Sequence, residues 1–226
     1  VLFDIDGTLV SSRGGIGRQA ISRVISDLHG RPVEVTAEEC AGRPDPQIVR
    51  NVLSRLGEPP ARIAGLLPVA MTRYLDALEA SYSPEAGAYC HDGATDLLAN
   101  LHARPDVVLG LLTGNHERGA RIKLAPFGLD RYFPFGAYGS DREERSELPA
   151  IAVARALDRT GIAFRGKDVV VVGDTVHDVR CGQHLGVTAV GVTTGPASRE
   201  ELLAEGADFV ADSLTPSPAL LAALLG

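Results

Sequence analysis

The chain has 226 residues, of which 45% are hydrophobic, and a formal net charge of −7. This length and composition allow a sizeable core in one large domain, or in a core domain that carries a smaller insert. The 29 acidic and 22 basic residues form no long blocks and no basic patch, which argues against a nucleic-acid partner.

The cysteine pattern and the hydropathy of the chain indicate in which cellular compartment the protein is expected. Cys40, Cys90 and Cys181 stand far apart without metal-ligand spacing, so we expect neither a disulfide framework nor a zinc site. No apolar run approaches the length of a membrane span, and no signal peptide precedes the first strand. We expect a cytoplasmic protein with no membrane partner. A targeting signal before Val1 stays open, because the chain begins inside a strand.

The first strand is predicted at the start of the chain, in the sequence VLFDIDGT. Alternate side chains of a strand share a face, so Asp4 and Asp6 reach one small volume where Gly7 lets the backbone turn. Two unpaired carboxylates would repel each other there, whereas Mg²⁺ prefers a site with one or two carboxylates. The alternative is a strand that ends in an ordinary Asx-rich turn.

Residues 12–89 have a different pattern, which predicts helices only. Apolar residues recur at helical spacing in three stretches, at 20–28, 48–56 and 63–78. This segment exceeds what one crossover connection needs, so we expect a helical cap at 12–89 inserted into a core formed by 1–11 and 90–226. The alternative is that these helices merely cover the sheet. The sequence does not indicate an oligomeric state.

From residue 107 onward, short apolar runs alternate with helical patterns, which is typical of a parallel α/β sheet of the Rossmann-like type. Strands are predicted at 107–112, 135–138, 168–172, 188–192 and 208–210. Helices are predicted at 117–126, 148–160, through 181–185 and at 198–205. In such sheets the ligand binds beyond the carboxyl ends of the strands, so polar residues at those ends are the candidates for function.

Two more strand ends carry suitable groups. Thr113, Gly114 and Asn115 offer a hydroxyl and backbone amides at a strand-to-helix turn, where the helix dipole favours an anion such as a phosphate. Asp174 and Asp178 follow the valine-rich strand, and one of them can face a metal while the other orients its waters. For Asp178 alone, the alternative is a helix N-terminal acid in a favourable dipole position.

These residues carry a resemblance to a known family. The segments DIDGTL, LLTGN and GDTVHD, in this order and at strand ends, resemble the first, second and fourth motifs of the haloacid dehalogenase-like hydrolase superfamily. The match spans nearly the whole chain. The resemblance implies a Rossmann-like sheet and a helical cap of the kind found in the phosphoglycolate phosphatase and β-phosphoglucomutase branch.

The resemblance also implies roles for the motif residues. Asp4 would be the nucleophile that forms an aspartyl phosphate, and Asp6 would be the general acid and then the general base. Thr113, Gly114 and Asn115 would bind the transferring phosphoryl group. Residues from the first and fourth motifs would hold Mg²⁺: Asp4, Asp6 through its carbonyl, Asp174 and Asp178.

The third motif of this family is usually a lysine, and here the sequence departs from the pattern. Lys167 precedes the valine strand, at the wrong end of the sheet, and Lys123 lies ten residues beyond Thr113, so neither is expected to reach the site easily. Arg145 follows the third strand, and we assign it the role of the lysine because a guanidinium bridges phosphate and carboxylate. Arg142 is the substitute candidate, and a solvated charged loop is the alternative.

In the cap, Arg43 lies in a proline-fixed loop between helices, and we expect it to contact a carboxylate or hydroxyl of the substrate. Arg13, in the hinge region, is a weaker candidate. His116 and His177 flank motif residues, and we expect both to be structural or solvent-facing.

The predicted function is a Mg²⁺-dependent phosphatase acting on a small phosphorylated metabolite, similar to phosphoglycolate or a sugar phosphate. Haloacid dehalogenases lack the second aspartate, and phosphonatases need a cap lysine, which residues 12–89 do not contain. A phosphosugar mutase of the same fold and a non-catalytic phosphometabolite-binding protein stay open as alternatives.

Overall fold

A computed structural model describes the backbone of residues 1–226 and every side chain except those of His184 and Leu185. Its main sheet has six strands in the order β5-β4-β1-β6-β7-β8, and every neighbouring pair is parallel. The strands are β1 (Leu2–Phe3), β4 (Gly110–Thr113), β5 (Gly136–Tyr138), β6 (Val170–Gly173), β7 (Thr188–Val192) and β8 (Phe209–Ala211). The predicted fold class, a Rossmann-like parallel α/β sheet, is confirmed.

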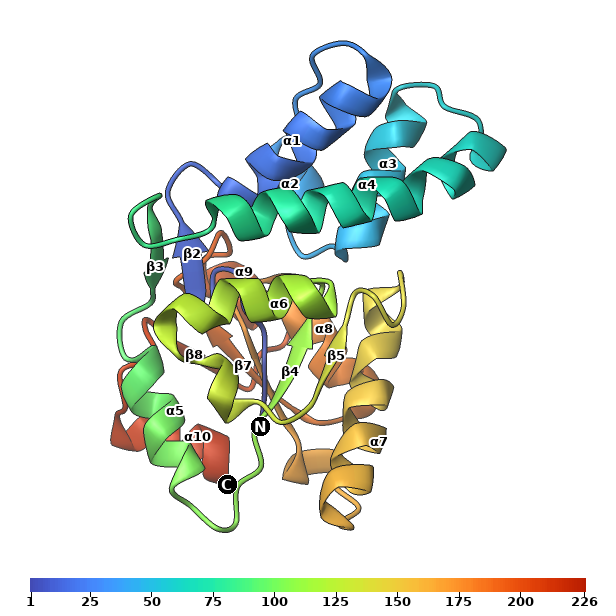
Figure 1. Cartoon of the computed structure of the whole chain (residues 1–226). Helices are drawn as coiled ribbons and strands as arrows, with labels where there is room; N and C mark the ends of the chain where they lie inside the picture. The colour runs from blue at the N-terminus through green and yellow to red at the C-terminus, as the bar shows by residue number, and fades with distance from the viewer.

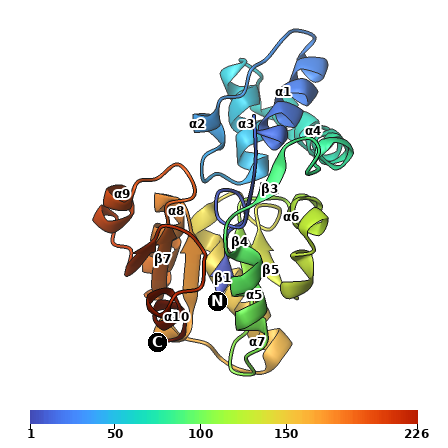
Figure 2. The same ribbon diagram turned by 90° about the vertical axis from the view of Figure 1, so that its left-hand side faces the viewer.

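Helices cover both faces of this sheet (Figures 1 and 2). On one face lie α5 (Ala94–His102), α6 (Glu117–Leu124) and α10 (Pro218–Leu225), and on the other lie α7 (Leu148–Thr160), α8 (Val176–Leu185) and α9 (Arg199–Ala204). The central strand β6 shows why its valine run is needed. Val170 and Val172 pack into the first layer, while Val169 and Val171 pack into the second, because alternate side chains point to opposite faces.

The cap is a bundle of helices above the sheet (Figure 1). It consists of α1 (Ile16–His29), α2 (Ala37–Cys40), α3 (Asp45–Arg55) and α4 (Pro60–Ser81). It has a hydrophobic cluster of its own, which includes the buried residues Ile25, Leu53 and Leu78 and is separate from the clusters against the sheet. The helices therefore form a second unit and do not merely cover the sheet.

Two short strands join the cap to the core, and they correct the expectation that residues 12–89 are helical throughout. β2 (Val10–Ser12) and β3 (Ala88–Cys90) pair antiparallel, with Ser12 opposite Ala88. Both chain crossings thus run through one two-stranded ribbon, which lies between the two units in Figure 2. The pairing joins segments that are distant in the chain, and local periodicity does not record it.

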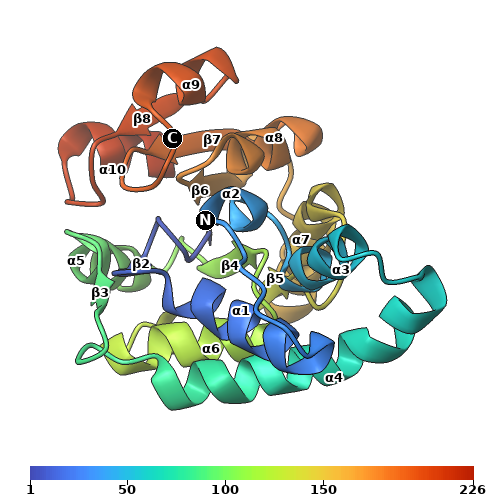
Figure 3. The same ribbon diagram turned by 90° about the horizontal axis from the view of Figure 1, so that it is seen from above.

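Viewed from above in Figure 3, α1 and α4 run side by side over the core. The arrow of β4 points toward the cap in Figure 1, and β1 and β6 run parallel to it, so the loops after these strands lie beneath the cap. Four short 3₁₀ turns complete the structure: Ala125–Phe127, Asp130–Tyr132, Arg145–Glu147 and Gly166–Asp168. None of the described helices combines the length and the apolar character needed to cross a bilayer.

Candidate active site

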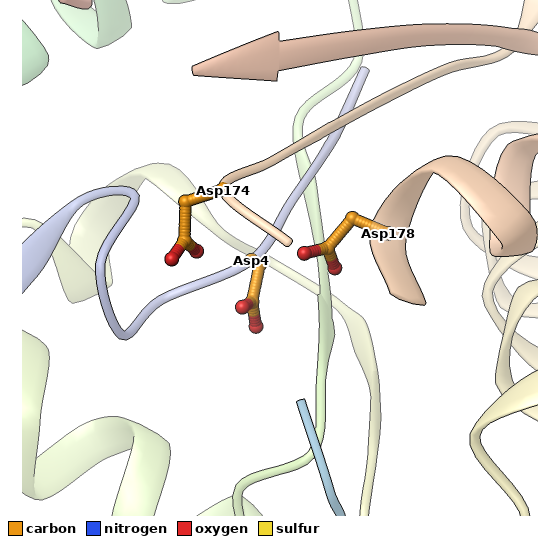
Figure 4. A group of neighbouring side chains, drawn as sticks. All are labelled: Asp4, Asp174 and Asp178. Atoms are coloured by element: carbon orange, nitrogen blue, oxygen red, sulfur yellow. The ribbon is translucent and has the colours of Figure 1, made fainter. Parts of the chain in front are cut away.

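Three buried aspartates meet at the carboxyl ends of β1 and β6. Asp4 follows β1, Asp174 follows β6, and Asp178 lies in the first turn of α8. One carboxylate oxygen from each lies within 4.8 Å of the other two, and the three side chains lie next to one another in Figure 4. Because these strands are neighbours in the sheet, segments 170 residues apart supply one cluster of negative charge.

Small residues make room for the Asp174 carboxylate. A Cβ atom at Gly195 would lie 1.6 Å from Asp174 Oδ2, and one at Gly7 would lie 2.2 Å from it. Gly7 also has a φ of +79°, a conformation that other residues rarely adopt. The Thr8 hydroxyl donates to Asp174 Oδ1 at 2.9 Å. Gly7 after β1 and Gly195 after β7 therefore leave space for Asp174, and Thr8 orients it.

Arg145 joins two of these aspartates to the cap. Its Nη2 lies 3.4 Å from Asp4 Oδ2 and donates to Asp178 Oδ1, while Nη1 donates to the carbonyl of Gly42 at 3.2 Å. The Thr175 amide and hydroxyl donate to the other oxygen of Asp178, at 3.1 and 2.7 Å. Asp178 thus has both roles considered for it, a helix N-terminal acid and a member of the aspartate cluster.

Burial controls the proton affinity of the cluster. It raises the pKa of Asp4 to about 6, against the opposing effect of Arg145, while Asp178 and Asp6 raise it further. Burial and the charges of Asp178 and Asp4 also raise the pKa of Asp174 well above its usual value. Carboxylates crowded in this way favour a bound cation, which stabilises their ionised forms.

Lys123 lies in the site, so the expectation that it does not reach the site easily is wrong. Its Nζ donates to both carboxylate oxygens of Asp6, at 2.7 and 2.8 Å, and to Asn115 Oδ1 at 2.6 Å. The helix begins only at Glu117, so Lys123 is six residues into it, and helical side chains lean back toward the N-terminus. The helical spacing alone could have shown this, since Ala120 and Lys123 share the buried face.

Asn115 completes this group. Its amide nitrogen donates to Asp6 Oδ2 at 2.7 Å and to Thr113 Oγ1 at 2.9 Å. The side chain that was expected to bind phosphate therefore orients Asp6 and Lys123 in this structure. Burial opposes the charge of Lys123, but the carboxylates of Asp6 and Asp45 outweigh burial and raise its pKa.

The loop before α3 of the cap rests on the loop after β4. The Asp45 amide donates to the carbonyl of Gly114 at 2.8 Å, and Asp45 Oδ2 accepts from the amide of His116 at 2.8 Å. A Cβ atom at Gly114 would lie 2.6 Å from the carbonyl oxygen of Arg43, so a glycine is needed for this contact. The cap therefore sits closed on the segment predicted to bind phosphate.

A cavity of about 610 Å³ lies between the cap and the strand ends. Its lining includes nearly all of the predicted site residues: Asp4, Asp6, Arg43, Thr113, Gly114, Asn115, Arg145 and Asp174. Asp178 stands behind Arg145, and Arg142 is exposed and pairs with Glu147. Thr113 Oγ1 accepts bonds from Asn115, so its hydroxyl proton is available to a ligand.

Comparison with known proteins agrees with this geometry. Residues 1–192 match the family model described as haloacid dehalogenase-like hydrolase. The chain belongs to the haloacid dehalogenase-like hydrolases. It is 30% identical to the phosphoglycolate phosphatase of Rhodospirillum rubrum over 94% of this chain and 86% of that protein. It is 28% identical to the phosphoglycolate phosphatase of Synechococcus elongatus over 98% of this chain and 95% of that protein. The structure of CbbY from Rhodobacter sphaeroides, solved in complex with phosphate, has the same fold, with a TM-score of 0.73. The match covers 95% of this chain and 93% of that chain, at 21% sequence identity.

In this haloacid dehalogenase-like hydrolase, Asp45 predicts a pH dependence of stability. Burial raises the pKa of Asp45 to about 6, and the charge of Asp6 acts in the same direction. Three smaller effects oppose this rise: the charge of Lys123, the His116 amide and a hydrogen bond with Tyr74. The folded protein therefore binds this proton more tightly than the unfolded chain, so the contribution to stability is full below about pH 4 and is lost as pH rises through about 6.

The quantity to follow is the difference in the free energy of unfolding between the native protein and Asp45→Asn. We expect this difference to change by up to about 3 kcal/mol between about pH 4 and pH 7, to the disadvantage of the native protein. Urea unfolding of both proteins across this range measures the difference, with the exposed Asp96→Asn as the control. Parallel pH profiles for native protein and Asp45→Asn would contradict the raised pKa.

Proposed function

We propose that this protein is a Mg²⁺-dependent phosphomonoesterase that transfers the phosphoryl group of a small metabolite to Asp4 and then to water. As a member of this family with phosphatases among its relatives, it is a hydrolase of phosphate monoesters. The metal, the covalent route and the substrate are our proposals. The observation that carries them is the cluster of Asp4, Asp174 and Asp178, bridged by Arg145 at the end of the cavity beneath the cap.

In the first step, a carboxylate oxygen of Asp4 forms a bond to phosphorus while the bond between phosphorus and the ester oxygen breaks. Arg145 fixes the orientation of Asp4, and its Nε is buried without a hydrogen-bond partner in this structure, which leaves it free to donate to a phosphoryl oxygen. The Thr113 hydroxyl and the Gly114 amide would hold the transferring group. The leaving oxygen takes a proton from Asp6 and departs as an alcohol.

In the second step, Asp6 accepts a proton from water as the water attacks phosphorus, which breaks the bond to Asp4 and releases phosphate. Asp6 is suited to both steps because its side chain is 50% exposed toward the cavity yet held by Lys123 and Asn115. The closed cap limits the entry of other water, since Asp45 bonds to the loop after β4.

The residues present fit Mg²⁺. Asp4, Asp174 and Asp178 bring three carboxylates within 4.8 Å of one another, and carboxylate oxygens are the donors that Mg²⁺ prefers. Asp4 and Asp174 face the cavity and would hold the ion directly, with the carbonyl of Asp6 as a further ligand, whereas Asp178 would orient the site. When bound, Mg²⁺ neutralises charge on the phosphoryl oxygens.

Removal of the metal is expected to abolish phosphate release, because the clustered carboxylates would then repel the anionic substrate. We expect a chelator to stop release from a panel of small phosphate esters and added Mg²⁺ to restore it. Asp174→Asn should need a higher Mg²⁺ concentration for half-maximal rate, while Asp106→Asn, at the opposite end of the sheet, should not. Full activity in the presence of chelator would contradict the proposal.

A further inference from the structure

Among the described side chains, two buried polar atoms have no hydrogen-bond partner, the Nε of Arg145 and the hydroxyl of Tyr82. Both residues line the cavity beneath the cap. A buried polar group without a partner costs free energy, so native structures rarely contain one unless a ligand or water completes it. The first of these atoms lies at the phosphoryl end of the cavity. The second has no role in the reaction proposed above.

Tyr82 stands where the cap meets the core. It directly follows α4, its amide donates to the carbonyl of Leu78, and the residue is only 5% exposed. Burial and then the charge of Asp6 raise the pKa of its hydroxyl, with Tyr89 and Cys90 acting in the same direction. The hydroxyl is therefore protonated, and Tyr82 lines the same cavity as Asp6.

We propose that the Tyr82 hydroxyl binds a hydroxyl group of the leaving alcohol, and that the substrate is accordingly a phosphate monoester of a polyol. This inference rests on the proposed function and narrows its substrate. A phenol can donate to or accept from a substrate hydroxyl, which would satisfy the atom that is orphaned here. Tyr82 is thus a specificity-determining residue outside the family motifs.

The charges around Tyr82 decide between a hydroxyl and a carboxylate on the leaving group. Among the neighbouring groups, the Asp6 carboxylate has the largest effect on the Tyr82 hydroxyl, and it is an anion. Lys123 is already bonded to Asp6 and Asn115. A second anion placed there would be repelled, whereas a neutral hydroxyl would not.

The shape of the cavity agrees with a leaving group of several carbons. Its volume of about 610 Å³ is in the range of small-molecule sites and exceeds what a phosphoryl group alone needs. Beside Tyr82, the cap lines it with Ile21, Ile48 and Tyr74, which offer apolar surface to a carbon chain.

The test compares two esters that differ in hydroxyl groups alone, glycerol phosphate and propyl phosphate. We expect native protein to favour glycerol phosphate in kcat/KM, and Tyr82→Phe to reduce this preference by about three- to tenfold, the effect of one neutral hydrogen bond. The matched control is Tyr89→Phe, because Tyr89 is 40% exposed and does not line the cavity, and it should keep the native preference.

A second readout separates recognition from a structural role. Without ligand, Tyr82→Phe should have a Tm equal to or above that of the native protein, because it removes an unpaired buried hydroxyl. A lower Tm, or an unchanged preference between the two esters, would overturn the role of Tyr82. Release from neither ester nor from any other in the panel would overturn the proposed function, and the substrate class with it.

Discussion

The Asp4→Asn variant is expected to release phosphate at least about 10,000-fold more slowly than the native protein, because an amide oxygen cannot replace a carboxylate nucleophile. The fold should persist. Asn has nearly the same shape as Asp, and the buried Asp4 carboxylate is itself unfavourable, as its raised pKa of about 6 shows. Phosphate release with saturating Mg²⁺ measures the effect, and circular dichroism confirms folding.

The control for this variant is Asp106→Asn, which removes an exposed carboxylate paired only with Arg104. It should retain native activity. Release by Asp4→Asn within about tenfold of the native rate would contradict the covalent route and would leave direct attack by water as the mechanism.

The second large effect is expected at Arg145. Arg145→Met should lower kcat/KM by about 100- to 1,000-fold, as loss of a donor to a developing anion does. It should also lower the free energy of unfolding by about 3–5 kcal/mol, since Asp4 and Asp178 lose their buried partner. Arg145→Lys should recover part of the activity, because a lysine keeps the charge but cannot bridge the two carboxylates.

Arg142→Met is the matched control for Arg145. Arg142 is exposed and its ion pair with Glu147 lies outside the cavity, so we expect its removal to change stability by no more than about 0.5 kcal/mol. Steady-state kinetics and urea unfolding of the three variants give the comparison. Native activity in Arg145→Met, or its loss in Arg142→Met alone, would reverse the assignment of the two arginines.

Much of the fold follows from periodicity in the sequence. The alternation of apolar runs and helical patterns after residue 107 predicts β4 to β8 in their order, because buried parallel strands are read directly from runs such as the four valines. The helices α5 and α10 were not predicted, and the paired strands β2 and β3 lie partly in a segment expected to be helical. These strands are stabilised by pairing between distant segments, which local pattern does not record.

The candidate site shows the same limit. Asp4, Asp174 and Arg145 could be placed from their positions at strand ends, where the topology of the sheet brings them together. Lys123 was missed although helical spacing indicates its buried face, because counting residues from Thr113 ignored where its helix begins and which way its side chain leans. The orphaned hydroxyl of Tyr82 has no signal in sequence at all, since it depends on which partners are absent in three dimensions.

The phosphosugar mutase alternative shares the first step and differs in the fate of the phosphoryl group. The cavity is closed by a cap whose described residues include no lysine and only one histidine, His29, which pairs with Glu58 and does not line the cavity. Retention of a phosphorylated intermediate for return transfer would therefore depend on the cap arginines Arg18 and Arg43, which line the cavity. We expect free phosphate to be the product.

The central claim, that Asp4 takes the phosphoryl group, is tested most directly by acid quenching of native protein during turnover with a phosphate ester. Mass spectrometry of its peptides should then show one added phosphoryl group on the N-terminal peptide that contains Asp4. Hydroxylamine should remove this group, and Asp4→Asn should never acquire it. Turnover without any phosphoryl group on that peptide, or with the group on another residue, would contradict the account.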